Sequence, residues 1–183
     1  MSPAITTLHR TQALYYLNVT DADLALVVNY GASSLQDERL PNFLRDKQPV
    51  FEWQPQPVDS SLLYPDLVNQ IQEACHRVHF TLGPGFLHQV YRWATMIELR
   101  RRGLSYDYIK QLPVTYQGQL LGHQAVRLIQ VEGKILLATF ALAGSAESPV
   151  EQLKARLRQL GLQLGLLANF YDTRLKLTPV RVK

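Results

Sequence analysis

The sequence predicts a mixed α/β (α+β) fold, and three stretches of the chain carry that prediction. Residues 67–80 and 86–102 are two helical segments separated by Leu82-Gly83-Pro84-Gly85, where Gly and Pro stop one helix and redirect the chain. Three strand-like segments follow between residues 112 and 142. The third stretch, residues 149–169, combines a helix with an apolar strand.

The first 61 residues predict a small arm and a linker. Residues 10–17 form a predicted helix, and the continuous apolar run 24–29 has the length of a strand buried on both faces. Residues 49–61 contain three prolines and no helical period, which is typical of a linker. We therefore expect an arm over residues 1–48 and a main domain over residues 62–183.

The main domain continues with a predicted hairpin. In the helix 86–102 apolar residues recur near a 3.6-residue period, so one of its faces is expected to be buried. Strands are predicted at 112–116, 123–131 and 134–142. The two-residue turn Glu132-Gly133 makes the last two an antiparallel pair.

The C-terminal part predicts a closing helix and strand. Pro149 suits the first position of a helix over residues 149–160, with Ser148 as its N-cap. Residues 162–169 form a predicted buried strand, and the basic tail 170–183 has the sequence of one further strand.

Composition and charge limit the possible functions. The net charge is +4, but residues 1–61 hold 4 basic and 7 acidic residues, whereas residues 62–183 hold 15 basic and 8 acidic ones. This asymmetry favours nucleic-acid affinity or a contact between arm and body, and ordinary solvated faces are the alternative. The single cysteine, Cys75, excludes a disulfide framework and is expected in the core. With no signal-like or membrane-spanning segment, we expect a cytoplasmic protein without membrane insertion.

The first 35 residues resemble a stretch near the end of the chain at an offset of 140 residues. Gln12 matches Gln152, Leu17 matches Leu157, and Asn29-Tyr30 matches Asn169-Phe170. Such self-similarity predicts two copies of one helix-strand unit, the remains of a tandem duplication. The N-terminal copy corresponds only to the closing half of the main domain, and the sequence leaves open whether it packs on its own chain or on a neighbouring one.

Several motifs of the main domain resemble those of a known family. The elements VH, LGPGFL, VY and IELRRRG between residues 78 and 103, then VEGK at 131–134 and GLQLGLLANF at 161–170, are similar to the GxxExxxY family of small prokaryotic proteins. That family belongs to the PD-(D/E)XK, restriction-endonuclease-like nucleases. The resemblance implies a mixed central sheet flanked by helices. It also implies Mg²⁺-dependent hydrolysis of phosphodiesters, in which an Asp and a Glu-x-Lys on adjacent strands hold the metal and position water.

Carried over position by position, the resemblance gives no metal ligands. The strand Asp falls at Leu128, the Glu at Ala138, the Lys at Phe140, and a further helix Glu at His88. Apolar side chains cannot replace the hard oxygen ligands of Mg²⁺. We therefore predict no catalytic residues, no metal and no cofactor.

Two sets of residues remain as candidate binding positions. The family's Gln-x-x-x-Tyr pair is split, because the C-terminal helix has Gln and Arg where the N-terminal helix keeps Gln and Tyr. The candidates at the former active-site cleft are His88, Tyr91, Gln152, Arg156, Gln12 and Tyr16. The candidates for contact with nucleic acid or an acidic partner are Arg100, Arg101, Arg102, Lys154 and Arg158. A transition-metal site at His76 and His79 is a weaker alternative to ordinary packing.

The sequence therefore predicts a catalytically inactive, nuclease-like domain that acts as a protein-binding or scaffold subunit, with a protein partner or a homo-oligomer. The alternative is a nucleic-acid-binding protein that does not cleave. A third reading, a Mg²⁺ nuclease that uses Glu98, Glu132 or His88, has less support from the pattern.

Overall fold

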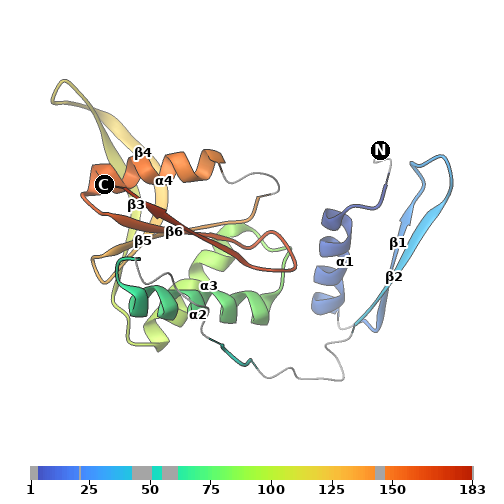
Figure 1. Cartoon of the computed structure of the whole chain (residues 1–183). Helices are drawn as coiled ribbons and strands as arrows, with labels where there is room; N and C mark the ends of the chain where they lie inside the picture. Colours follow the sequence, from blue (N-terminus) through green and yellow to red (C-terminus); the bar gives the residue numbers. More distant parts are fainter. Residues whose placement is uncertain (1–3, 21, 43–50, 55–61, 143–146, 183) are drawn as a thin grey trace.

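The computed structural model describes residues 4–20, 22–42, 51–54, 62–142 and 147–182 (Figure 1). Its elements in chain order are α1 (Thr7–Thr20), β1 (Leu24–Asn29), β2 (Gln36–Pro41), α2 (Pro65–Leu82), α3 (His88–Arg101), β3 (Tyr106–Tyr116), β4 (Gln119–Val131), β5 (Ile135–Phe140), α4 (Glu147–Leu160), β6 (Leu164–Asn169) and β7 (Lys176–Arg181). They form a five-stranded sheet in the order β3-β4-β5-β6-β7 and a separate two-stranded sheet of β1 and β2.

The main domain is a mixed sheet between two helical layers. Only β5 and β6 run parallel, and the other neighbouring strands are antiparallel. Helices α2 and α3 cover one face and α4 covers the other (Figure 1). This is the helix-flanked mixed sheet that the sequence predicts, and it is consistent with a restriction-endonuclease-like fold.

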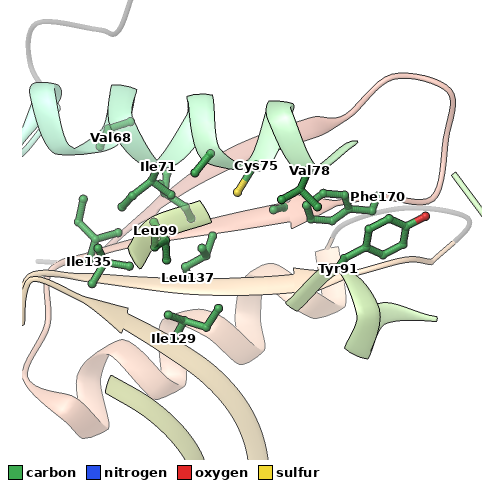
Figure 2. Close-up of a cluster of buried hydrophobic side chains, with 14 of the residues drawn as sticks. Val68, Ile71, Cys75, Val78, Tyr91, Leu99, Ile129, Ile135, Leu137 and Phe170 are labelled. Atoms are coloured by element: carbon green, nitrogen blue, oxygen red, sulfur yellow. The ribbon is translucent and has the colours of Figure 1, made fainter. Parts of the chain in front are cut away.

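The larger core lies between the sheet and the helix pair α2–α3 (Figure 2). Cys75 is fully buried there, as predicted, and burial raises the pKa of its thiol to about 12. The ring of Tyr91 stacks on Phe170 with centroids 4.5 Å apart. The Tyr91 hydroxyl donates to the carbonyl of Gly83 at 2.8 Å and accepts from the N–H of Phe86 at 3.1 Å, so Tyr91 holds the Gly-Pro-Gly turn in place.

The smaller core lies on the opposite face, under α4. Leu153 and Leu157 of α4 pack on alternate residues of β5, β6 and β7. The approach is closest at Gly165, where an added Cβ would lie 2.8 Å from a methyl carbon of Leu153. A glycine at this point of β6 therefore lets the helix lie directly on the strand.

The N-terminal unit, α1-β1-β2, has the same order of elements as the closing unit α4-β6-β7, at an offset of 140 residues. The offset holds for the bounds of all three elements and for every residue pair between the two strands, from Leu24↔Pro41 and Leu164↔Arg181 onward. It extends to a turn, because Asn29 and Asn169 both accept the N–H of the residue two positions later. The structure thus gives both stretches one local architecture.

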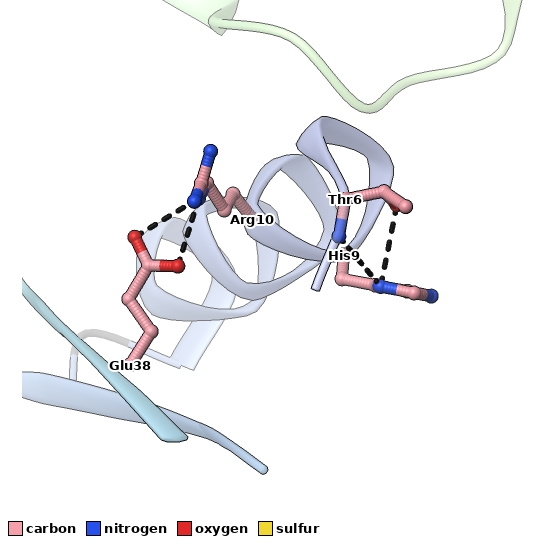
Figure 3. Close-up of polar contacts among 4 residues, drawn as sticks. All are labelled: Thr6, His9, Arg10 and Glu38. Atoms are coloured by element: carbon pink, nitrogen blue, oxygen red, sulfur yellow. Dashed lines mark hydrogen bonds and ion pairs between the residues drawn. The ribbon is translucent and has the colours of Figure 1, made fainter. Parts of the chain in front are cut away.

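Polar contacts complete the N-terminal unit (Figure 3). His9 Nδ1 lies 3.1 Å from the N–H of Thr6, an arrangement that caps the first turn of α1. Arg10 Nε contacts both carboxylate oxygens of Glu38, at 2.9 and 2.8 Å, and so ties α1 to β2. The ring of Tyr15 packs against the ring of Phe86, with centroids 4.9 Å apart. This contact places α1 against the Gly-Pro-Gly turn of its own chain.

The two units differ in what covers them. Leu164 and Leu166 are fully buried beneath α2 and α3, whereas their counterparts Leu24 and Leu26 are 50% and 58% exposed. The prediction that residues 24–29 form a strand is confirmed, but the prediction that both faces are buried is wrong. The strand has the apolar sequence of a buried strand, yet among the described residues only α1 packs on one of its faces.

Other predictions of elements need correction. Strand β2 was not predicted, because its central residues Asp37, Glu38 and Arg39 are all charged and give no alternation of apolar and polar side chains. Ser148 is not an N-cap, since α4 begins one residue earlier. Of the predicted linker 49–61 only residues 51–54 are described. There Phe51 and Trp53 pack on α2. The ring centroids of Phe51 and Phe80 are 5.4 Å apart, and those of Trp53 and His76 are 5.1 Å apart.

Within the described part of the chain, no helix combines the length and the apolar character needed to cross a membrane.

Candidate functional site: an arginine-lined cleft

A cleft of about 270 Å³ lies where the start of α3 meets β4, β5 and α4. The four positions to which the resemblance assigns the acids and the lysine, Leu128, Ala138, Phe140 and His88, all line it. These residues come from three elements, and the fold brings them together. The cleft therefore brings together the four positions that the resemblance assigns to one site.

The charged side chains of the cleft are cationic. Arg92, Arg127 and Arg156 line it, and none of the sixteen described lining residues carries a carboxylate. The pKa of His88 is lowered by partial burial and by the positive charges of Arg92 and Arg127. The cleft is therefore a region of positive potential.

Arg92 is the most buried of these cations, with 3% of its surface exposed. One terminal nitrogen lies 3.4 Å from the hydroxyl of Tyr108, and within the described part of the chain its Nε has no hydrogen-bond partner. Thr139 of β5 is 7% exposed, and its hydroxyl likewise has no partner among the described residues. Buried polar atoms are normally paired. Three other buried atoms outside the cleft, on Asn69, Gln72 and Arg102, also lack a partner among the described residues, so the lack of a partner does not by itself mark a site.

A β-bulge places Arg127. The pairing of β3 with β4 shifts register between Ile109 and Gln111, and Arg127 opposite this shift has a φ of 53°. A positive φ is unfavourable for a residue with a Cβ, and bulges commonly redirect side chains beside functional sites. The strain is thus located at a cation of the cleft.

The cleft contains three of the six candidate binding residues. His88, Gln152 and Arg156 line it, and a terminal nitrogen of Arg156 donates to the side chain of Gln124 on β4. Tyr91 does not reach the cleft, because it is fully buried against Phe170 and the Gly-Pro-Gly turn.

The other two candidates, Gln12 and Tyr16, line a separate cavity of about 480 Å³ in the N-terminal unit, between α1 and β1. The idea that the arm supplies residues to the main cleft therefore finds no geometric support.

The predicted basic contacts are largely engaged elsewhere. Arg101 pairs with Glu98 at 3.1 Å, Arg102 with Glu73 at 2.7 Å, and Lys154 with Glu151 at 2.7 Å. Arg100 donates to the hydroxyl of Tyr106 at 3.1 Å. Arg158 is exposed on α4 and does not line the cleft.

Sequence reasoning missed Arg92, Arg127 and Thr139. Arg92 sits in a helix among candidate core positions, and only the tertiary structure shows that it lines the cleft. The signal for Arg127 was a charged residue within an otherwise apolar strand, AVRLIQV, but a bulge is not visible in such a pattern.

A comparison with protein families gives one match. The family model described as the PD-(D/E)XK nuclease superfamily matches residues 65–182. The chain belongs to the PD-(D/E)XK nuclease superfamily. No curated protein and no solved structure gave a significant match. The matched region covers α2 to β7 and leaves the N-terminal unit outside.

Nucleases of the PD-(D/E)XK type imply a divalent metal, and the residues of this cleft do not fit one. Mg²⁺ requires oxygen ligands, preferably carboxylates, and the assigned positions hold Leu128, Ala138 and Phe140. The nearby guanidinium groups would repel a cation. Among the described residues, no group of three or more His, Cys, Asp or Glu side chains could hold a metal ion.

The two glutamates considered as substitute ligands lie outside the cleft. Glu98 pairs with Arg101, and Glu132 accepts the N–H of Ser105 at 2.6 Å in the turn before β5. The histidine pair is also explained by packing, since His79 Nε2 contacts the carbonyl oxygen of Asp172 at 2.8 Å and His76 lies against Trp53.

Proposed function

We propose that this PD-(D/E)XK protein no longer hydrolyses phosphodiesters and acts as a protein-binding or assembly subunit. The loss of hydrolysis is supported by the cleft, where apolar side chains stand at three of the four positions that the resemblance assigns to the catalytic residues and the other charged lining residues are arginines. The test is incubation with plasmid DNA and single-stranded RNA in Mg²⁺ or Mn²⁺. We expect no cleavage above a buffer control, and metal-dependent cleavage that persists through repeated purification would contradict the proposal.

The assembly role is supported by one observation, the bare apolar face of the N-terminal unit. Tyr30 is 83% and Leu35 65% exposed, whereas their counterparts Phe170 and Leu175 belong to the main core. Together with Leu24 and Leu26, Tyr30 and Leu35 occupy positions whose counterparts in the closing unit are buried in the main core or packed against it. Among the described residues of the N-terminal unit, no counterpart of α2 and α3 covers these side chains. Contiguous exposed apolar surface of this kind marks interaction sites.

A second copy of the chain is the proposed occupant. Among the described strands β2 is the one that pairs with β1, so no strand lies along the other edge of β1, and a two-stranded sheet is marginally stable by itself. Two copies related by a twofold axis can bury the same face and edge of each other without any further component.

Light scattering after size exclusion tests this assignment. We expect a dimer at tens of micromolar protein that Leu26→Glu converts to a monomer. Leu121→Glu is the matched control, because Leu121 is 68% exposed at the tip of the β3–β4 hairpin, away from the N-terminal unit. A monomer at all concentrations, or a dimer broken equally by both substitutions, would contradict a dimer through this face.

Nucleic-acid binding without cleavage is the second candidate, and the arginine-lined cleft favours it. Binding through such a surface should weaken steeply as salt rises, because counterions are released from the phosphates. Absence of a mobility shift with DNA or RNA at low salt would remove this candidate and leave the assembly role untouched.

A further inference from the structure

We propose that the cleft binds a phosphate-type anion directly on its arginines, in the place where PD-(D/E)XK nucleases hold a metal. The ligand class is a phosphate group, either free or at the end of a nucleic-acid strand. The inference is independent of the assembly role, and it makes the nucleic-acid alternative more specific by naming the group that is bound.

The first argument is the unpaired charge of Arg92. Arg92 as a whole is 3% exposed, and the described residues offer its guanidinium the Tyr108 hydroxyl and the face of the Tyr108 ring, 6.0 Å away, but no carboxylate. A buried cation without a counter-ion is costly, and a bound anion would remove that cost. A guanidinium presents its donors in a fork that matches phosphate oxygens.

The second argument is that the remaining groups of the cleft supply donors of the same kind. Arg127 is brought to the site by the bulge in β4, at an unfavourable φ. Arg156 lies on the opposite wall, on α4, with its guanidinium held by Gln124 and Gln159. Cations from α3, β4 and α4 thus line one cleft.

The third argument is volume and access. About 270 Å³ accommodates a phosphate group with part of an attached sugar, and the exposed side chains of His88 and Gln152 at the cleft leave it accessible from solvent. A neutral His88 beside the arginines would add one further hydrogen-bond donor to a phosphate oxygen.

Isothermal titration with inorganic phosphate in the presence of EDTA tests the proposal. We expect one saturable site per chain that persists in EDTA, because no metal takes part. Arg127→Gln and Arg156→Gln should each weaken binding at least about 10-fold, the effect of losing one charge-assisted hydrogen bond. Arg158→Gln is the matched control, since it removes the same charge from the same helix outside the cleft and should change affinity less than about 2-fold.

Arg92→Met tests the buried cation of the cleft. Because Arg92 is 3% exposed, its replacement also changes packing, so its effect on phosphate binding is interpreted only beside its effect on thermal stability. Arg127 is exposed and Arg156 is half-buried, and their variants keep the proposal falsifiable if Arg92→Met does not fold.

Two oligonucleotides identify the source of the phosphate. A DNA tetramer with a 5′-phosphate should compete with inorganic phosphate, and the same tetramer without it should compete at least about 10-fold less well if strand ends are the ligand. Equal, weak competition by both would assign the site to free phosphate. No phosphate binding at about 20 mM, or binding that the Arg127 and Arg156 variants leave unchanged, would overturn the proposal. Failure of the mobility shift alone would remove only the nucleic-acid function.

Discussion

The closing unit α4-β6-β7 and the N-terminal unit α1-β1-β2 have the same elements and the same strand register, yet one lies inside the protein and the other on its surface. Phe170 is fully buried on Tyr91, while its counterpart Tyr30 is 83% exposed. Local sequence is thus sufficient to define helix, strands and turn. Burial depends on whether another layer covers the sheet.

The largest difference is expected when the paired aromatic residues are truncated. Phe170→Ala should lower the free energy of unfolding by about 3–5 kcal/mol, because it removes a buried ring and leaves a cavity. Tyr30→Ala should change it by less than about 0.5 kcal/mol, as at an ordinary exposed site.

Urea denaturation at a low micromolar concentration, followed by tryptophan fluorescence, measures both effects on the main domain. A large effect of Tyr30→Ala that grows with protein concentration would show that the N-terminal face is covered in an assembly. A large effect at every concentration would show that it packs on its own chain, and the comparison would fail.

A second prediction concerns how closely each helix lies on its strand. Gly165→Ala should destabilise the protein by about 1–3 kcal/mol, because the new Cβ would lie 2.8 Å from Leu153. The N-terminal unit has Ala13 and Ala25 at the equivalent positions, so the smaller helix residue there accompanies the larger strand residue.

The double variant Leu153→Ala/Gly165→Ala places the N-terminal pair into the closing unit. We expect it to be less destabilised than the sum of the single variants, because removing the Leu153 side chain relieves the clash at residue 165. Thermal denaturation of the four proteins of the cycle measures the coupling. Strict additivity would mean that Leu153 and residue 165 do not limit the approach of α4 to β6.

The sequence was sufficient for the elements whose signals are local. The Gly-Pro-Gly turn and the apolar runs at 24–29 and 162–169 each predicted a feature that the structure contains. The Glu132-Gly133 turn predicted the antiparallel pair β4–β5 correctly, but Val131 pairs with Ile135, so the connection has three residues and not two. Strand β2 was not predicted, because most of its residues are polar or charged. A polar edge strand lacks the regular spacing of apolar residues by which strands are recognised.

The candidate site was predictable only in part. Position-by-position comparison placed Leu128, Ala138, Phe140 and His88 together, and they do share one cleft. The cations opposite them were not predictable, because the apolar pattern of α3 does not include Arg92 among its buried positions and Arg127 depends on a bulge. Tyr91 was also assigned to the cleft, but its ring stacks on Phe170 and its hydroxyl bonds to Gly83 and Phe86, so it does not line the cleft.

The smallest expected difference concerns the ion pair that ties α1 to β2 in the N-terminal unit. Arg10 and Glu38 are joined at 2.8 Å with side chains 47% and 31% exposed, and the equivalent positions in the closing unit hold Val150 and Thr178. An exposed pair contributes about 0–1 kcal/mol, so Glu38→Gln should reduce the protection of β1 amides against hydrogen exchange by less than about 5-fold. The difference between parent and variant should shrink further in 1 M salt, where the Debye length is about 3 Å. A larger, salt-independent loss would mean that this pair, rather than the apolar contact of α1 with β1, holds the N-terminal unit together.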